Sequence, residues 1–264
     1  MDLDTVEEVV GAAEAGAWRA ADGWLAGGTF LFSEPQPHLR RLRDLTTLGW
    51  APLTVTSEGL EIAATCTIAE LSRLEPPPPL VLQCCRAFLA SFKVWNVATV
   101  GGNLCAALPA GPMISLTAAL DGWCVLEAPD GSHRHVAVID FVTGAGQNAL
   151  AEGEFLRSIF LPASALAARA AFRQGSLYPL GRSAALVTGR VDPDSVGLIL
   201  TVTASTPRPV QLRFAHLPSA GELRVALEEA IPAELYVDDV HGLPAWRRHL
   251  TLRFATEILQ ELAA

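Results

Sequence analysis

The hydrophobic and polar positions of this chain change period several times, which predicts a mixture of helices and strands. Helical spacing of apolar residues covers Thr5–Ala20, Thr67–Leu74, Leu80–Phe92, Pro112–Leu120, Leu217–Ile231 and a last segment from Pro244. Alternation around turn residues predicts two hairpins, Leu53–Thr56 with Leu60–Ala63 and Trp123–Glu127 with His135–Ile139. Other strands are expected at Gly23–Ala26, Glu154–Leu161, Ala184–Val191 and Val196–Ala204. The pattern predicts a chain that contains both helices and strands.

Composition narrows the class of protein. The chain has 264 residues, half of them hydrophobic, and a formal net charge of −9. This charge argues against a nucleic-acid surface, which needs clustered cations to replace the counterions of phosphates. The apolar runs are too short to span a bilayer, and the acidic start does not resemble a secretion signal. We therefore expect a cytoplasmic protein without a membrane span.

The cysteines predict no metal or disulfide framework. There are five, an odd number, with no C-x-x-C pair and no spacing that suits zinc or an iron–sulfur cluster. We expect reduced thiols that pack as small hydrophobic side chains. They are Cys66, Cys84, Cys85, Cys105 and Cys124.

Two glycine pairs are the most informative feature of the sequence. Gly27-Gly28 and Gly101-Gly102 each close an apolar stretch and are followed by a small hydroxyl or amide side chain, Thr29 and Asn103. Glycine lets successive backbone N–H groups turn toward one anion and lets that anion approach the main chain. The two pairs together predict two turns that hold the two halves of a pyrophosphate.

Several motifs around these glycines occur in a fixed order. They are Leu25–Thr29, Leu60–Leu71, Ala98–Leu104, Leu108–Gly111, Ala119–Asp121, Phe155–Pro162, Asp238–Gly242 and Trp246–Leu250. In this order they resemble the FAD-binding medium subunit of molybdenum hydroxylases, the xanthine dehydrogenase and carbon monoxide dehydrogenase family. The resemblance covers nearly the whole chain, and the second glycine motif with the Pro-Ala-Gly that follows it is its most specific part.

The resemblance implies a fold and a function. The fold would be the p-cresol methylhydroxylase type of FAD-binding domain, with two α+β subdomains at 1–55 and 56–165. A C-terminal domain of three antiparallel strands and helices would follow at 166–264. The chain would be an oxidoreductase subunit that binds FAD and transfers electrons. Molybdopterin would lie in a large partner subunit and two-iron two-sulfur clusters in a small one, with NAD, oxygen or a quinone as the acceptor.

The expected FAD contacts follow from the glycine turns and from the resemblance. No catalytic acid or base is named, because the flavin itself performs the redox chemistry. Leu156 resembles the apolar residue that contacts the isoalloxazine ring in this family. The full set is Leu25, Ala26, Gly27, Gly28, Thr29, Phe30, Leu31, Thr99, Gly101, Gly102, Asn103 and Leu156.

Three residues depart from the family pattern. Phe30 follows Gly-Gly-Thr where many members have Asp or Ser, Pro112 follows Pro-Ala-Gly where they have Asp, and Trp95 precedes Asn96 where they often have Arg. A missing carboxylate at Pro112 removes a hydrogen bond worth about 0.5–1.5 kcal/mol. Two alternatives therefore stay open, a structural subunit that binds flavin weakly and a stand-alone flavoprotein oxidoreductase.

Other polar residues are expected to have ordinary structural roles. His133 and His135 occupy alternate strand positions and should point to solvent. His241 should be a loop residue and His249 a helix-surface residue. The basic group Arg40, Arg41 and Arg43 should form a solvated surface.

Overall fold

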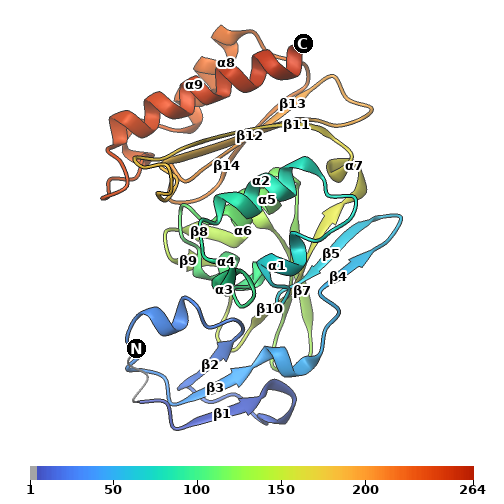
Figure 1. The fold of residues 1–264 in the computed structure, drawn as a ribbon, viewed down its shortest axis with the longest axis vertical. Helices are drawn as coiled ribbons and strands as arrows, with labels where there is room; N and C mark the ends of the chain where they lie inside the picture. Colours follow the sequence, from blue (N-terminus) through green and yellow to red (C-terminus); the bar gives the residue numbers. More distant parts are fainter. Residues whose placement is uncertain (1–4) are drawn as a thin grey trace.

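The computed structural model describes residues 5–264 and contains three main sheets that follow one another along the long axis of the molecule (Figure 1). Residues 1–4 of the predicted first subdomain lie outside the described part. Helices and strands alternate throughout, so the α+β prediction is confirmed. Among residues 5–264, no helix has both the length and the apolarity needed to cross a bilayer.

The N-terminal sheet has three parallel strands in the order β1-β3-β2. Its strands are β1 (Glu8–Gly11), β2 (Asp22–Leu25) and β3 (Arg41–Asp44), with 3-10 turns η1 (Ala12–Glu14), η2 (Leu31–Ser33) and η3 (Leu45–Leu48). The helix expected over Thr5–Ala20 is wrong. Three valines and two glycines disfavour a helix in this segment, and β3 offers the segment a ladder partner, so pairing prevails over the local pattern.

A buried ion cluster holds this sheet together. Arg41 donates two hydrogen bonds to the carboxylate of Asp22, at 2.8 and 2.6 Å, and Arg43 donates a third at 2.8 Å. The same guanidinium groups bond the backbone carbonyls of residues 15–17. The predicted solvated basic surface is therefore wrong for Arg41 and Arg43, which are buried, and only Arg40 is exposed.

The middle sheet has five antiparallel strands in the order β4-β5-β10-β6-β7. Its strands are β4 (Leu53–Val55), β5 (Gly59–Ala63), β6 (Trp123–Glu127), β7 (His133–Ala137) and β10 (Phe155–Pro162). Both predicted hairpins are present. Because β4 pairs with β5, the first sheet ends with β3, before the boundary predicted at residue 55. A small pair, β8 (Val142–Gly144) and β9 (Gln147–Asn148), lies beside it.

Short helices pack against the middle sheet. They are α1 (Ile68–Leu71), α2 (Pro79–Ala87), α3 (Phe92–Trp95), α4 (Val100–Ala106), α5 (Pro112–Ala119), α6 (Val138–Phe141) and α7 (Ala163–Leu166). Thr67 caps α1 with Glu70 in a reciprocal capping box. The helix predicted to reach Phe92 ends at Ala87, and Leu89 adopts a positive φ of 44°. Every residue of α5 is buried, which fits its lack of a polar face.

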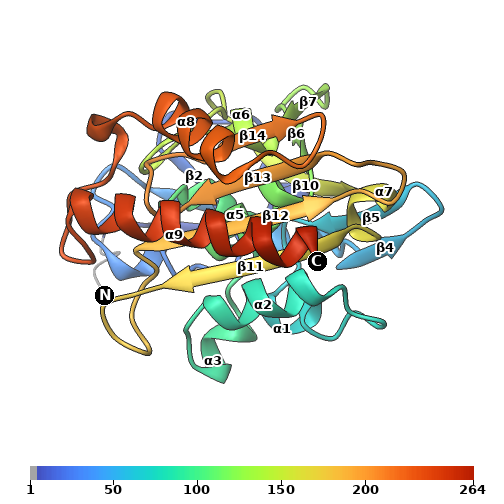
Figure 2. The same cartoon turned by 90° about the horizontal axis from the view of Figure 1, so that it is seen from above.

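The C-terminal sheet has four antiparallel strands, one more than predicted. They are β11 (Arg169–Gly175), β12 (Ala185–Val191), β13 (Leu198–Thr203) and β14 (Val210–Phe214). The alanine-rich start of β11 carries no clear alternation, so pairing with β12 decides its conformation. The helices α8 (Ala220–Ala230) and α9 (Pro244–Ala263) cover the outer face and α5 the inner one, with the 3-10 turn η4 (Ala233–Leu235) between α8 and α9 (Figures 1 and 2).

Candidate functional site

A cavity of about 1050 Å³ lies where the three parts of the chain meet. Its wall includes residues 26–31 after β2, the start of α4, the segment 108–112 before α5, and residues 155–156 of β10. The C-terminal part contributes residues 180–183 and 237–241. Ligand cavities in proteins usually measure about 300–1,000 Å³, so this volume suits a large ligand.

The first glycine pair forms a tight turn at this cavity. A Cβ on Gly27 would lie 1.9 Å from the carbonyl oxygen of Val97, and a Cβ on Gly28, whose φ is +66°, would lie 2.5 Å from the ring of Phe32. Only glycine therefore fits at both positions. The backbone N–H groups of residues 27–30 have no intramolecular acceptor within residues 5–264. Four consecutive free donors at a cavity wall form a site that suits an anion.

The second glycine pair has a different geometry from the one predicted. Gly101 and Gly102 lie inside α4, and their N–H groups donate to Ala64 O at 3.0 Å and to Thr99 Oγ1 at 3.0 Å. The neighbouring N–H groups of Val100 and Asn103 are also bonded within the chain. The prediction of an open turn is therefore wrong here. The N–H groups of residues 100–103 instead donate to acceptors at the start of α4 and in the adjoining 64–66 loop.

The glycines of the second pair face different sides of α4. A Cβ on Gly101 would lie 2.5 Å from Ala64 Cβ and 2.7 Å from Ala64 Cα, so this glycine permits close packing of α4 on the 64–66 loop. A Cβ on Gly102 would meet only Thr99 Oγ1, at 2.8 Å, and otherwise open space. Gly102 therefore keeps the cavity wall free of side-chain atoms.

Asn103 joins two helices at the cavity. Its Oδ1 accepts a hydrogen bond from Met113 N at 3.0 Å and so caps the start of α5. Pro112 occupies the first turn of α5 and is buried. The side chains of Thr99 and Asn103, expected to bond a ligand, thus already have partners within the protein. Asn103 keeps its amide nitrogen without an acceptor among the described residues.

Aromatic side chains form part of the cavity wall. Leu156, 2% exposed, follows Phe155 on β10, and Phe155 packs on Trp24 with ring centroids 4.7 Å apart. Trp50 stacks on the same Phe155 at 6.0 Å. These contacts give this part of the wall flat, apolar surfaces. Among the predicted site residues, Leu25 is the exception, because it ends β2 and does not line the cavity.

The C-terminal wall was missing from the sequence-based site. Arg247, 1% exposed, donates to the carbonyl oxygens of Gly242, Ala184 and Ala204 at 2.7–2.9 Å and pairs with Asp239. It thereby fixes the 237–242 loop, which carries His241 to the cavity. His241, expected to be only a loop residue, is therefore a wall residue. The available sequence signal was the pair of motifs Asp238–Gly242 and Trp246–Leu250, which contain Asp239 and Arg247.

Cys105 also lines the cavity. Burial raises the pKa of the Cys105 thiol to about 12, so it stays protonated at neutral pH. Within residues 5–264 all five cysteines are free thiols, and four of them are fully buried. This agrees with small hydrophobic packing roles.

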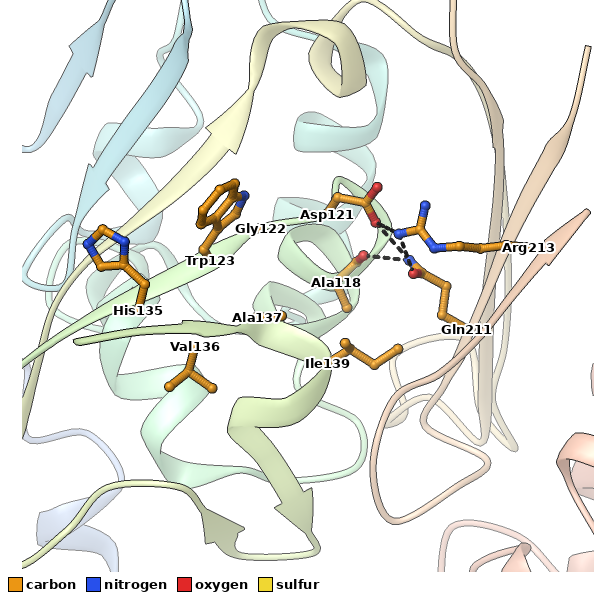
Figure 3. A pocket seen from close by; sticks show the side chains of 10 residues that line it. All are labelled: Ala118, Asp121, Gly122, Trp123, His135, Val136, Ala137, Ile139, Gln211 and Arg213. Carbon is orange, nitrogen blue, oxygen red and sulfur yellow. Dashed lines mark hydrogen bonds and ion pairs between the residues drawn. The ribbon is translucent and has the colours of Figure 1, made fainter. Parts of the chain in front are cut away.

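A second hollow, of about 430 Å³, lies between β6, β7 and β14 (Figure 3). On one side, Asp121 accepts hydrogen bonds from Gln211 and Arg213, and it also pairs with the buried Arg190. These polar groups satisfy one another across the joint between the middle and C-terminal sheets. Trp123 and His135 lie on the other side and are exposed, as expected for His135. This hollow is part of an interdomain joint.

Comparison with known families identifies the family of this chain. A family model described as the FAD binding domain in molybdopterin dehydrogenase matches residues 4–164, which is more than half of the chain. The chain belongs to this family. The match covers the N-terminal and middle sheets and both glycine pairs of this FAD-binding domain. It confirms the family that the motif order indicated and makes FAD the cofactor of the fold.

Individual relatives agree with this FAD-binding domain assignment. Xanthine dehydrogenases 1 and 2 of Arabidopsis thaliana are each 29% identical over 121 residues, 42% of this chain. The chain spans only about a tenth of the length of these relatives, since the match covers 9% of each. The family relationship is therefore to one part of a much longer oxidoreductase.

Solved structures show the same fold along nearly the whole chain. Carbon monoxide dehydrogenase from Hydrogenophaga pseudoflava, in a form that lacks the Mo-pyranopterin moiety of its cofactor, gives a TM-score of 0.80 at 19% identity. That match covers 97% of this chain and 96% of the other. Quinoline 2-oxidoreductase from Pseudomonas putida 86 gives 0.76 at 20% identity, over 92% and 89%. At these identities the comparison establishes the fold, and it extends over the C-terminal part of the chain.

Proposed function

We propose that this chain is the FAD-carrying electron-transfer subunit of a molybdenum-dependent hydroxylase or dehydrogenase complex. The observation that carries the proposal is the turn at residues 26–31. Four consecutive backbone N–H groups, without acceptors among residues 5–264, line a cavity large enough for a dinucleotide. FAD carries a pyrophosphate in its middle, and backbone donors of this kind bind such an anion. The residues present therefore fit the cofactor of the family.

The roles of the chain's residues in this site differ between the two glycine pairs. Residues 27–30 would bind the pyrophosphate through the main chain, whereas Gly102 would leave room for the cofactor against α4. Leu156 and its aromatic neighbours would offer the apolar surface for a ring. When bound, FAD supplies the electron-transfer chemistry, and the protein contributes position and polarity. The remaining predicted residues, Ala26, Leu31, Thr99, Gly101 and Asn103, would shape the wall.

The proposed function also includes partner subunits. Solved relatives in the comparison include a Cu,Mo-CO dehydrogenase, matched over 91% of this chain. We infer that this chain works beside a large molybdenum-cofactor subunit and a small iron–sulfur subunit. Substrate would be oxidised in the large subunit, and electrons would reach FAD through the clusters. An external small molecule such as NAD, oxygen or a quinone would then accept them.

The direct test is the flavin content of the purified full-length chain. We expect flavin absorption bands after purification or after reconstitution with FAD. We also expect no hydroxylation of aromatic heterocycles or aldehydes by the chain alone. Failure to bind FAD would favour the structural subunit with weak flavin binding. Robust hydroxylation by the isolated chain would favour the stand-alone flavoprotein.

A variant at the first glycine pair tests where the cofactor binds. Gly27→Ala places a Cβ against the Val97 carbonyl and should distort the turn that holds the free donors. We expect loss of FAD retention. Gly221→Ala is the matched control, because a Cβ there meets only Ser219 Oγ, at 3.9 Å, and α8 does not line the cavity. Full retention of FAD by the Gly27 variant would refute the assignment of this turn.

A further inference from the structure

One short segment of the cavity wall is held by two turns that are distant from it in the sequence. Residues 107–112 lead from α4 into α5, and all but the first of them line the cavity. Gly146 N, in the turn between β8 and β9, donates a hydrogen bond to Ala107 O at 2.9 Å. Ala204 N, directly after β13, donates to Pro109 O at 2.9 Å. Two separate turns therefore support this part of the wall.

The segment makes few hydrogen bonds of its own. Pro109 and Pro112 have no N–H group, and Gly111 N donates to Leu108 O, inside the segment, at 2.8 Å. Among residues 5–264, the hydrogen bonds that reach the segment from outside α4 and α5 come from the two turns. The position of this wall segment thus depends on them.

Both donors lie at backbone conformations that most residues avoid. The value of φ is +69° at Gly146 and +66° at Ala204, in the left-handed region. Glycine adopts this region freely, whereas an alanine there is strained. Within residues 5–264 the other non-glycine residues with a positive φ are Asp121, Leu89, which lines the cavity, and Ala107, which begins the wall segment. Strain that a fold maintains is typical of ligand sites.

The two turns keep this conformation for different reasons. Ala204 is 1% exposed, its carbonyl oxygen accepts a hydrogen bond from Arg247 at 2.7 Å, and it packs in a small buried cluster with Ala87 and Leu186. These contacts compensate for the strain. Gly146 is exposed, and a Cβ there would meet nothing within 4 Å. Its backbone conformation, and not a lack of space, therefore requires glycine.

We propose that Gly146 and Ala204 are positioning residues for FAD, which hold residues 107–112 where the bound cofactor needs them. This inference rests on the proposed function. Each residue acts through its hydrogen bond to the segment and needs no contact with the cofactor. A side chain that disfavours a positive φ turns the N–H group away and releases the segment. FAD binding must then restore the shape of the wall, which lowers the affinity.

The first test compares two side chains of similar size at Gly146. Valine disfavours a positive φ, whereas asparagine tolerates it. Fluorescence titration of the apo-protein with FAD should show about tenfold weaker binding for Gly146→Val, from a backbone cost of about 1–2 kcal/mol. Gly146→Asn should bind almost as tightly as the unmodified chain.

Gly131→Val is the matched control for the first test. Gly131 also has a positive φ, +81°, and a Cβ there would also meet nothing within 4 Å. Its N–H group likewise donates to a backbone carbonyl, Ala128 O, at 2.9 Å. Gly131 does not line the cavity, so this variant should bind FAD as the unmodified chain does.

The second test uses the other turn. Ala204→Gly keeps the positive φ and should keep the FAD affinity within about twofold, whereas Ala204→Val should weaken it about tenfold. Ala171→Val adds the same volume at a buried strand position of the same sheet, outside the cavity, and should leave FAD binding unchanged. If Ala204→Val does not fold, the variants at Gly146 decide.

The outcomes separate this inference from the proposed function. Unchanged FAD binding by Gly146→Val overturns the inference. Equal weakening by Gly146→Val and Gly146→Asn also overturns it, because side-chain volume would then decide binding. Hydrogen exchange of the apo-protein should show that the N–H groups of Gly146 and Ala204 are protected. If the unmodified chain binds FAD although these groups exchange freely, only the inference fails. If it binds no FAD, the proposed function fails, and the inference fails with it.

Discussion

At the scale of single residues, neighbouring glycines have different reasons to be glycine. Gly101 is required by packing, because a Cβ would overlap the backbone of Ala64. Gly102 is not required by packing, since a Cβ would meet only the Thr99 hydroxyl. The sequence presents the two as one motif. The structure separates a fold-determining glycine from one that leaves space for a ligand.

This difference gives a paired prediction. Gly101→Ala should lower the thermal midpoint, because the overlap with Ala64 forces α4 away from the 64–66 loop, at a cost of about 1–3 kcal/mol. Gly102→Val should keep the fold, apart from about 1 kcal/mol for the disturbed Thr99 cap, and lose FAD. Thermal unfolding and bound-flavin absorbance measure the two effects. Full FAD retention by a folded Gly102→Val protein would contradict the assignment.

Pro112 provides a second prediction at this scale. Its place in the first turn of α5 lets an aspartate replace it without loss of a helix hydrogen bond, because N–H groups there have no helical acceptor. The new carboxylate would lie at the cavity wall beside a helix N-terminus, which favours negative charge.

We expect Pro112→Asp to tighten FAD by at most about tenfold, or about 1.4 kcal/mol. Fluorescence titration of the apo-protein with FAD compares the variant with the unmodified chain. Pro207→Asp is a control for the general effect of replacing a proline, because Pro207 does not line the cavity. Equal or weaker binding by Pro112→Asp would show that the site has no use for this carboxylate.

At the scale of elements, the N-terminal sheet depends on one buried carboxylate. The hydrogen bonds from Arg41, with those from the backbone of Arg19 and from Arg43, hold the pKa of Asp22 well below its usual range despite burial. The guanidinium groups in turn fix the 15–17 segment, and Arg43 lies over the rings of Trp18 and Trp24. Asp22 therefore connects the sheet, through Arg43, to the aromatic side chains near the cavity.

This cluster predicts a pH-dependent stability. A carboxylate with a depressed folded-state pKa stabilises the fold above its unfolded pKa of about 3.9, and this contribution is lost as pH falls toward the folded-state pKa. Asp22→Asn should remove about 3–5 kcal/mol at neutral pH, because two buried cations lose their partner.

Urea unfolding between pH 7 and pH 3 measures this contribution. The unmodified chain should lose stability below about pH 4, and Asp22→Asn should lose less over the same range. Asp194→Asn, at an exposed carboxylate without an ion pair within residues 5–264, is the control. Identical pH profiles for the unmodified chain and Asp22→Asn would contradict the prediction.

At the scale of the whole molecule, the C-terminal sheet completes the cavity, so its attachment to the middle domain matters. Ser115 and Thr203 share a hydrogen bond of 2.6 Å between α5 and β13, and Ala204 N donates to Pro109 O at 2.9 Å. Arg190, 3% exposed, donates to Ala119 O at 2.9 Å and pairs with Asp121. These contacts position the wall that carries Arg182 and His241.

The last prediction compares two arginines that bind the same carboxylate. Arg190→Ala should loosen the C-terminal sheet by about 3–5 kcal/mol, because it leaves a hole and unpaired polar groups in a buried joint. Arg213→Ala should cost less than about 1 kcal/mol, since the Arg213 side chain is 55% exposed. Calorimetry and limited proteolysis between residues 163 and 184 measure the loosening. If the two variants lost equal stability, the greater burial of Arg190 would not explain its contribution.

The sequence alone determined the family, the cofactor and most of the hairpins and helices of the middle and C-terminal parts. Turn residues, alternation and capping act over a few neighbours, so their effects can be predicted from the chain, as at Thr67 and in the hairpin at residues 57–59. The glycine pairs were found for the same reason. Backbone freedom is a property of the residue itself.

Only the tertiary structure decided which polar groups remain free. Arg41 and Arg182 are both arginines, yet one is buried against Asp22, and the other lines the cavity and has no ion pair within residues 5–264. Likewise, the donors of residues 27–30 are free, whereas those of residues 100–103 are bonded, in part to Ala64 and Cys66. Whether a donor has a partner depends on segments distant in the sequence, because long-range packing brings those partners together.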